Sequence, residues 1–490
     1  MLENLKFMKV EQIYTGCLAE AAYLIESEGE AVIIDPLRET QPYLEKLQKE
    51  GLKLKYIFET HFHADFVSGH VDLAQKTGAT IVYGPNAETN YQIHQAKDGE
   101  IIRLGKVTFK VLHTPGHTME STTYLLRDEK GKDHAIFTGD TLFLGDVGRP
   151  DLAIKQGELT REDLAGFLFD SLRMKIMPLA DEVIVYPAHG AGSACGKNLS
   201  ADTWGYLGDQ KKSNYALRAD MTRKEFVAEV TAGLTPPPQY FAKNAMLNKS
   251  GYASFDEVLG HGNTPLSPER FEAMVEDHEA LMLDTRTAQE FAAGHVPNSI
   301  FIGIDGSFAP WVGALITDIK QPIVVIAPAG REEEVVTRLA RVGYDNTLGY
   351  LEGGVEAWEK SGREIDTVES ISGSELADRM RGNFNATILD SRKPTEYITQ
   401  HILDAINFPL DYVNSNMDRI RRDEKYYIHC RTGYRSMVMA SILKARGFHQ
   451  VVDIKNGWES IEAAPIAVSD YTCPTTIPQE VIDDAVAAVV

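Results

Sequence analysis

The densest set of possible metal ligands in the chain is an HxHxD pattern formed by His61, His63 and Asp65. It follows an apolar, strand-like run that ends at Glu59. Imidazole nitrogens and carboxylate oxygens are common ligands of zinc and of non-haem iron. The next residue, Phe66, has a phenyl ring with no lone pair to donate. The pattern therefore predicts a metal site at a strand end, and Phe66 favours one metal ion over two.

Further residues of ligand type follow other strand-like runs. They are Asp35, His117, Asp140 and His189, and each stands in a short turn after an apolar or alternating segment. Any one of these histidines by itself would more often be a hydrogen-bonded surface or core residue than a ligand. Ligands held on the rigid ends of strands can converge on one point, whereas scattered loop residues cannot. The ordered recurrence therefore predicts one shared site.

A different chemistry is indicated by the segment 430–436, which reads CRTGYRS and lies between the strand-like run 426–429 and a predicted helix. Such a loop can turn its backbone N–H groups toward a single anion, and a helix N-terminus and two arginines also favour negative charge. We therefore expect Cys430 to be a reactive thiolate nucleophile, with Arg431 and Arg435 beside it.

Phosphoryl transfer is the main alternative for this loop, because cysteine phosphatases also place an arginine after a His-Cys pair. Only four residues separate Cys430 from Arg435, one fewer than a phosphatase loop needs to surround a phosphate. The shorter loop suits one extra sulfur atom on the thiolate. Sulfur transfer is favoured, with a persulfide on Cys430 as the covalent intermediate.

The second half of the chain contains an internal repeat. Six positions of the first copy recur at a constant spacing: Leu283, Asp284, Arg286, Glu290, His295 and Ile300 return as Leu389, Asp390, Arg392, Glu396, His401 and Ile406. Strands that alternate with helices predict a parallel sheet in each copy. When Gly330 is aligned with Gly433, Ala327 occupies the position of Cys430. Because alanine cannot be a nucleophile, we expect the first copy to be catalytically inactive.

Length and composition limit the classes of protein that need to be considered. A chain of 490 residues suggests about three domains. The net charge of −22 argues against a nucleic-acid or anionic-membrane partner. No apolar run approaches the roughly 18 residues that a membrane span needs, and the first ten residues lack an apolar signal core, so a cytoplasmic location is expected. Four cysteines are too few for a disulfide scaffold.

The order of the strand-end clusters resembles the metallo-β-lactamase superfamily over about the first 240 residues, with HxHxD as its most specific motif. The two repeats resemble the rhodanese family. Together they resemble the bacterial persulfide dioxygenase–rhodanese fusion proteins. The expected fold is α/β: an αββα sandwich over 1–245, followed by rhodanese-like, doubly wound parallel-sheet domains over 262–363 and 370–467, the first of them inactive, and a tail over 468–490.

This resemblance implies one Fe(II) per chain held by His61, His117 and Asp140. It also implies that a small-molecule persulfide is oxidised with O₂ to thiol and sulfite, and that Cys430 then joins sulfur to sulfite as thiosulfate. The remaining polar residues near the metal would orient its ligands or hold water. They are His63, Asp65 and His189. The resemblance makes a homo-oligomer the expected assembly, and the sequence does not identify the thiol that carries the persulfide.

Two residues have weaker assignments. Arg149 could pair with an anionic group of the substrate, although a plain surface arginine is equally compatible with the sequence. Cys195 could carry sulfur near the iron, although a small residue packed in a glycine-rich turn explains it slightly better. The alternative function is a zinc-dependent thiolesterase of the glyoxalase II kind, joined to a sulfurtransferase domain. Two-metal hydrolases of this superfamily usually carry histidine where this chain has Phe66. A non-enzymatic sulfur carrier with a structural metal is a third possibility.

Overall fold

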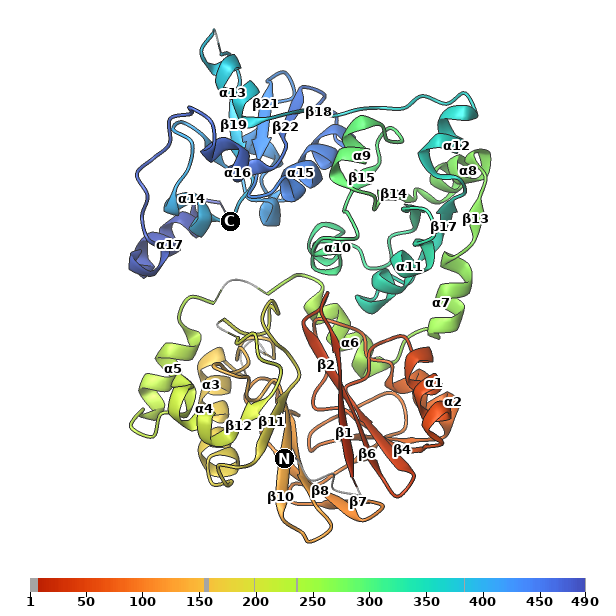
Figure 1. The fold of residues 1–490 in the computed structure, drawn as a ribbon, viewed down its shortest axis with the longest axis vertical. Coiled ribbons are helices and arrows are strands. Elements are labelled where there is room, and N and C mark those ends of the chain that lie inside the picture. The colour runs from red at the N-terminus through yellow and green to blue at the C-terminus, as the bar shows by residue number, and fades with distance from the viewer. Residues whose placement is uncertain (1–7, 154–157, 198, 235–236, 383, 490) are drawn as a thin grey trace. The chain divides into compact units, whose positions relative to one another are not determined.

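The computed structural model describes residues 8–153, 158–197, 199–234, 237–382 and 384–489 (Figure 1). The chain forms two compact units, one of residues 1–255 with 340–343 and one of residues 256–339 with 344–490. Among the described residues, no helix is both long enough and apolar enough to cross a membrane.

The first unit contains two six-stranded sheets, with strand orders β1-β2-β3-β4-β5-β6 and β12-β11-β10-β9-β8-β7. Their strands are β1 (Lys9–Thr15), β2 (Glu20–Ser27), β3 (Glu30–Ile34), β4 (Lys53–Phe58), β5 (Thr80–Tyr83), β6 (His94–Gln95), β7 (Ile101–Leu104), β8 (Val107–His113), β9 (Thr122–Arg127), β10 (Asp133–Gly139), β11 (Ile184–Pro187) and β12 (Gly205–Tyr206). The helices of this unit are α1 (Gln41–Glu50), α2 (His70–Thr77), α3 (Arg161–Ser171), α4 (Leu207–Ser213), α5 (Arg223–Thr231) and α6 (Phe241–Ser250).

Apolar side chains from both sheets form one core between them, which includes Tyr23, Phe58 and Phe137. A second layer packs α1 and α2 on the outer face of the first sheet, and a third packs α3 and α5 on the other sheet (Figure 1). Strand β2 is buried almost throughout, as expected for a strand covered on both faces. The predicted αββα sandwich is therefore confirmed.

The second unit contains two five-stranded sheets of the same strand order, β13-β17-β16-β14-β15 and β18-β22-β21-β19-β20. The first copy has strands β13 (Pro265–Leu266), β14 (Leu281–Asp284), β15 (Ile300–Phe301), β16 (Ile323–Ile326) and β17 (Thr347–Leu351), with helices α7 (Phe255–Gly262), α8 (Pro268–His278), α9 (Ala288–Ala293), α10 (Phe308–Leu315), α11 (Glu332–Arg341) and α12 (Gly354–Lys360). The second copy has strands β18 (Glu369–Ile371), β19 (Thr387–Asp390), β20 (Ile406–Asn407), β21 (Tyr426–His429) and β22 (Val451–Ile454), with helices α13 (Gly373–Met380), α14 (Pro394–Thr399), α15 (Tyr434–Ala445), α16 (Gly457–Glu462) and α17 (Gln479–Ala487).

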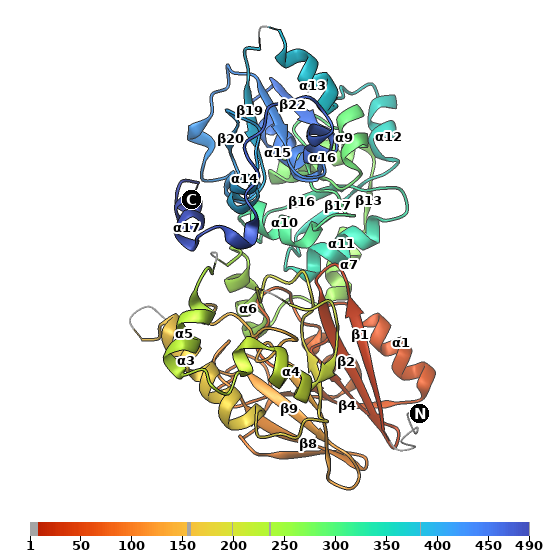
Figure 2. The ribbon, with the colours of Figure 1, turned by 60° about the vertical axis from the view of Figure 1, so that its left-hand side comes forward.

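Every strand pair in these two sheets is parallel, which confirms the repeated parallel α/β fold. Figure 2 shows β19, β20 and β22 of the second copy with α15 and α16 beside them. The cysteine loop, residues 430–433, lies between β21 and α15, at the carboxyl end of a central strand, and residues 434–436 of the predicted loop form the first turn of α15. Ligands of open parallel sheets commonly bind at that end.

Candidate metal centre and cysteine loop

Three of the predicted ligands converge in the first unit. His61 lies shortly after β4, His117 follows β8, and Asp140 comes directly after β10. The Nε2 atoms of His61 and His117 lie 4.0 Å and 3.4 Å from Asp140 Oδ2, and all three residues are buried. Neither carboxylate oxygen of Asp140 has a hydrogen-bond partner in the described structure. A buried carboxylate left without partners is costly unless a cation compensates it, so the three residues fit a metal ion.

The two histidines are oriented by neighbouring oxygen atoms. The Thr60 hydroxyl donates to Asp35 and therefore accepts from His61 Nδ1 at 3.0 Å. His117 Nδ1 donates to the backbone carbonyl of Arg149 at 2.9 Å. Both rings thus keep the Nε2 lone pair for a metal, the usual way in which outer partners fix a ligand. Burial, reinforced by the nearby imidazoles, holds the pKa of His61 well below its usual range, which favours the neutral form.

His63 makes a different set of contacts. Its Nε2 atom lies 3.1 Å from Asp35 Oδ1 and 3.5 Å from Glu59 Oε2. Burial opposes a charge on this ring, but Asp35 and Glu59 together raise its pKa well above the usual range. The Phe66 ring packs against it, with ring centroids 4.3 Å apart. His63 is therefore fixed between two carboxylates and a phenyl ring.

A second cluster adjoins the first through Asp140. His189 Nε2 lies 3.4 Å from Asp65 Oδ2 and 3.5 Å from Asp140 Oδ1. Ligand atoms of His63, Asp65 and His189 lie within 4.8 Å of one another, so these three could also hold an ion. Six of the seven candidate metal ligands singled out in the sequence are thus brought together in two adjoining groups. The seventh, Asp35, lies beside them and contacts Thr60 and His63.

Asn248 on α6 is a positioning residue that the sequence motifs did not indicate. Its side-chain amide donates to the backbone carbonyls of His63 and Phe66, both at 2.8 Å. Its oxygen accepts the backbone N–H of Ser68, also at 2.8 Å. One fully buried side chain therefore fixes three points of the loop 63–68. No local signal could have found it, because an asparagine far along the chain is not distinctive by itself.

Arg149 and Cys195 both lie near the metal cluster. Arg149 is buried and forms a bidentate ion pair with Asp151, at 2.6 and 2.8 Å. Its backbone N–H donates to the carbonyl of Cys195. The sulfur of Cys195 is within 4.8 Å of ligand atoms of Asp140 and His189. Burial and the nearby carboxylates raise the pKa of the Cys195 thiol well above its usual range, so this thiol is neutral without a metal.

In the second unit, Cys430 is buried at the start of its loop. The Gly433 N–H donates to Cys430 Sγ at 3.1 Å, and Gly433 has a φ of +94°, a conformation that favours glycine. The Cys430 carbonyl accepts the Trp458 N–H at 2.7 Å. The Ser436 hydroxyl donates to buried Asp453 at 2.7 Å. Among the described contacts, the Gly433 N–H is the backbone donor that reaches the sulfur, and the other two hydrogen bonds hold the loop around it.

The two arginines of this loop differ in their surroundings. Arg435 forms a bidentate ion pair with Glu396, at 2.6 and 2.9 Å, so its charge is shared with a carboxylate. Arg431 is exposed. The sequence showed both cations and gave Glu396 as a repeat position, but it did not show that Glu396 pairs with Arg435. The positive charge available to an incoming anion is therefore smaller than the sequence indicated, and Arg431 is the more accessible source of it.

The corresponding loop of the first copy contains no thiol. Ala327 follows β16, and Gly330 has a φ of +80°. Arg331 pairs with Asp305 and with Glu334. The backbone turn is thus kept while the reactive group is missing.

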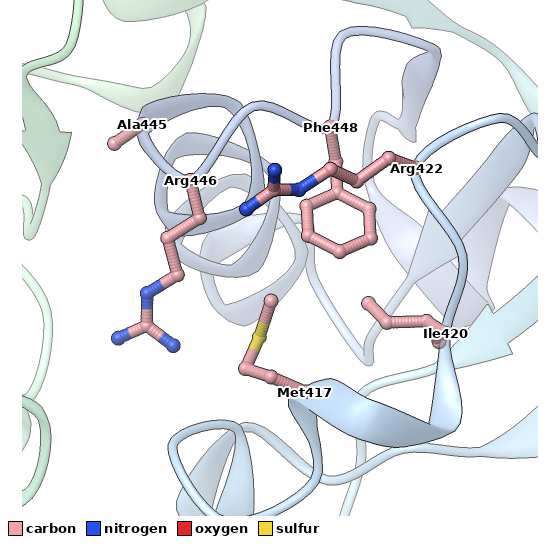
Figure 3. Close-up of a pocket in the computed structure, with 6 residues that line it drawn as sticks. All are labelled: Met417, Ile420, Arg422, Ala445, Arg446 and Phe448. Carbon is pink, nitrogen blue, oxygen red and sulfur yellow. The ribbon is translucent and has the colours of Figure 1, made fainter.

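One cavity of about 560 Å³ in the second unit is lined by Met417, Ile420, Arg422, Ala445, Arg446 and Phe448 (Figure 3). None of the residues singled out in the sequence lines it. It lies at the C-terminal end of α15, whereas the cysteine loop lies at the N-terminal end. The cavity therefore does not identify a reactive centre. The candidate centres are identified by the residue types in the metal cluster and in the cysteine loop.

Comparisons with known proteins agree with this division. Residues 15–189 match the Metallo-beta-lactamase superfamily, and residues 267–361 and 372–464 each match the Rhodanese-like domain. The mitochondrial persulfide dioxygenase ETHE1 of Homo sapiens is 35% identical over 37% of this chain and 67% of its own length. The hydroxyacylglutathione hydrolase GloC of Haemophilus influenzae is 28% identical over 39% of this chain and 94% of its own. A crystal structure of a metallo-beta-lactamase from Staphylococcus aureus subsp. aureus COL is 32% identical, with a TM-score of 0.62, and covers 70% of this chain and 98% of that chain.

Proposed function

Because the chain belongs to the metallo-β-lactamase superfamily and carries two rhodanese-like domains, we propose that it is a persulfide dioxygenase joined to a thiosulfate-forming sulfurtransferase. The chain combines a metal-binding enzyme fold with sulfurtransferase-type domains. The proposal adds the substrate class, a low-molecular-weight persulfide, and the metal, one Fe(II).

The observation that carries the proposal is the three-residue cluster around Asp140. Ligand atoms of two histidines and one carboxylate lie within 4.8 Å of one another, and both oxygens of the carboxylate lack hydrogen-bond partners in the described structure. Three protein ligands would leave other coordination positions of an iron ion open for substrate and O₂. Iron held there would supply the redox chemistry that joins O₂ to the outer sulfur. The balanced reaction is R–S–SH + O₂ + H₂O → R–SH + SO₃²⁻ + 2H⁺. A phenyl ring at Phe66, instead of a further ligand, supports a single metal ion.

The protein residues around the metal position would have separate tasks. His61, His117 and Asp140 would hold the ion, with His61 and His117 oriented by Thr60 and by the backbone carbonyl of Arg149. The His189 imidazole lies between the Asp65 and Asp140 carboxylates and could hold a water molecule or relay a proton. Cys195 could meet the substrate sulfur, because its thiol lies beside Asp140.

The proposed transfer step takes place on Cys430. A persulfide on this residue would expose its outer sulfur to sulfite, the nucleophile. The S–S bond to Cys430 breaks as the sulfur bonds to sulfite, and Cys430 leaves as the thiolate: Cys–S–S⁻ + SO₃²⁻ → Cys–S⁻ + S₂O₃²⁻. The Gly433 N–H, which donates to Sγ, would stabilise the charge of the leaving thiolate. Exposed Arg431 would attract the anionic sulfite.

A zinc-dependent thiolester hydrolase is the second candidate. The cluster of His63, Asp65 and His189 favours it, because a second ion there would allow two-metal activation of water. The match that covers 94% of GloC also supports it. The presence of Phe66 beside His63 weighs against a second ion.

One experiment separates the two candidates. The protein is purified without added metal, its iron and zinc contents are measured, and oxygen uptake is followed after glutathione persulfide is added. Lactoylglutathione hydrolysis is assayed in parallel. Iron near one per chain with persulfide-dependent oxygen uptake supports the dioxygenase, whereas zinc with thiolester cleavage and no oxygen uptake would replace it by the hydrolase.

A further inference from the structure

The helix that begins at the cysteine loop is buried on nearly every side. Residues 436–443 of α15 are all buried, with no polar stripe facing solvent. A helix that is apolar all round belongs in the interior of a protein. One face of α15 packs on β21 and β22 of its own sheet, and another packs on β15 of the first copy.

The contact with the first copy is also specific in its hydrogen bonds. β15 is an edge strand of the first sheet, and the N–H of Phe301 in that strand donates to the Ser441 hydroxyl of α15 at 2.8 Å. Ser441 in turn donates to the carbonyl of Val438 at 2.7 Å. A buried edge-strand N–H is thereby satisfied by the helix of the other copy. The two copies thus pack against each other at the helix that follows the cysteine loop.

Tyr434 links this interface directly to the cysteine. It is the first residue of α15 and follows Gly433, whose N–H donates to Cys430 Sγ. The Tyr434 hydroxyl donates to the backbone carbonyl of Gly303 in the first copy at 2.8 Å. Its ring makes an edge-on contact with Phe301, with centroids 5.7 Å apart. Burial and the nearby Asp305 raise the pKa of the Tyr434 hydroxyl, so it remains a hydrogen-bond donor.

The segment 303–306 of the first copy is shaped to receive this ring. A Cβ atom added at Gly306 would lie 2.3 Å from Tyr434 Cε2, a distance that real side chains do not reach. Asp305 of the same segment is held by two hydrogen bonds from Arg331, the residue of the first copy that aligns with Tyr434. The altered loop of the first copy therefore anchors the segment that contacts the intact loop of the second.

We propose that the first rhodanese-like copy is a positioning domain for the second, and that Tyr434 is the positioning residue through which it holds the Gly433 N–H on Cys430. The first copy, although it contains no thiol, would then have a structural role and would not be a remnant without function. Tyr434 does not touch the sulfur, so it acts through the backbone of Gly433. The consequence for sulfur transfer rests on the proposed function of Cys430, but the positioning itself can be tested without it.

The test is the pH profile of Cys430 alkylation by iodoacetamide in the full chain, followed on the peptide that contains Cys430 so that Cys17, Cys195 and Cys473 do not interfere. Tyr434→Phe removes only the hydroxyl. A weaker hold on the Gly433 N–H should move the profile upward by about half a pH unit, so that alkylation at neutral pH slows about threefold. Gly306→Ala should have a larger effect, about tenfold, because it displaces the ring.

Two matched controls isolate the effect. Tyr344→Phe removes a hydroxyl that also donates to a backbone carbonyl in the first copy, that of Ile316, away from the cysteine loop. Gly260→Ala adds a methyl group where nothing lies within 4 Å. Both controls should keep the wild-type profile, and thermal unfolding checks that each variant is folded. If Gly306→Ala does not fold, Tyr434→Phe decides the outcome.

Two results would overturn the proposal: a Tyr434→Phe profile that superimposes on the wild type, or an equal shift in Tyr344→Phe. A separate assay of thiosulfate formation distinguishes this inference from the proposed function. If the wild-type protein forms no thiosulfate while the alkylation profile still shifts in Tyr434→Phe, the proposed sulfur-transfer activity is wrong and the positioning role of Tyr434 is supported. If thiosulfate forms and the profile does not shift, the transfer activity stands and the positioning role is wrong.

Discussion

The metal centre and the cysteine loop both contain buried reactive groups, but they differ in whether the polar atoms around those groups have hydrogen-bond partners. The loop is one continuous segment, and apart from exposed Arg431 its main polar groups have partners within the protein: the Gly433 N–H donates to Cys430, Ser436 to Asp453, and Arg435 to Glu396. The metal centre is assembled from separate strand ends, and it leaves both oxygens of Asp140 and Nε2 of His189 without hydrogen-bond partners in the described structure.

This difference shows which site needs a ligand to be complete. A satisfied hydrogen-bond network can keep its shape alone, whereas a buried carboxylate without hydrogen-bond partners needs a cation to compensate its charge. Substitutions in the cysteine loop should therefore affect the reactivity of Cys430 and leave the metal content unchanged. Changes in the cluster should first affect metal content.

The largest expected effect concerns the loop. Cys430→Ser should abolish sulfur transfer to sulfite, a loss of more than about 10³-fold, because a hydroxyl cannot accept a persulfide sulfur at neutral pH. Persulfide-dependent oxygen uptake should be largely retained, with sulfite accumulating in place of thiosulfate. Both products are measured by chromatography after derivatisation, against the non-enzymatic background. Enzymatic thiosulfate formation by this variant would contradict the assignment and point to Cys195 as the carrier.

The next effect concerns the metal ligands. His61→Ala, His117→Ala and Asp140→Ala should each remove iron and oxygen uptake, because each deletes one of only three protein bonds. His63→Ala should retain iron, with an affinity reduced by about 10- to 100-fold. Metal content is measured by mass spectrometry, with exposed His94→Ala as the control. The triad would be wrong if His63→Ala lost metal as completely as His117→Ala while His61→Ala kept it.

A smaller effect tests the network behind the loop. Burial raises the pKa of Asp453 to about 6, despite hydrogen bonds from Ser436 and Ser370. An unfolded aspartate titrates near 3.9, so its stabilising contribution is fully present below about pH 4 and is lost as the pH rises through about 6, by about 2–3 kcal/mol. Asp453→Asn should flatten this part of the unfolding free energy between pH 4 and 7.

Urea unfolding across this pH range measures the Asp453 effect, and exposed Asp423→Asn serves as the control that keeps the wild-type slope. An Asp453→Asn variant whose stability fell with pH as steeply as that of the wild type would show that Asp453 is not the titrating group.

The smallest expected effect is a change in the number of metal ions bound per chain. Phe66→His should supply a ligand type next to His63, Asp65 and His189, and allow a second zinc ion to bind in excess zinc. Phe66→Leu is the matched control, because leucine cannot ligate. Zinc is counted per chain after gel filtration. A Phe66→His protein that still holds one ion would show that the phenyl ring is not what limits the site to one metal.

Much of the fold could be predicted from the sequence because its signals are local. Alternating and apolar runs that end in ligand-type turns indicated the sandwich, and the recurrence of Asp284 and Arg286 as Asp390 and Arg392 indicated two parallel α/β copies. The candidate ligands could be recognised by residue type and order. Their convergence was expected because ligands on rigid strand ends can converge on one point, and the structure places these ends on both sheets of the sandwich.

The sequence by itself therefore determined which residues can do chemistry and which elements carry them. Only the tertiary structure decided the partners: Asn248 on the loop 63–68, Glu396 on Arg435, and the carbonyl of Gly303 on Tyr434. Each of these contacts joins residues far apart in the chain, and no local periodicity encodes it. Side-chain partners depend on how layers pack, and packing is fixed by the whole buried surface and not by any one segment.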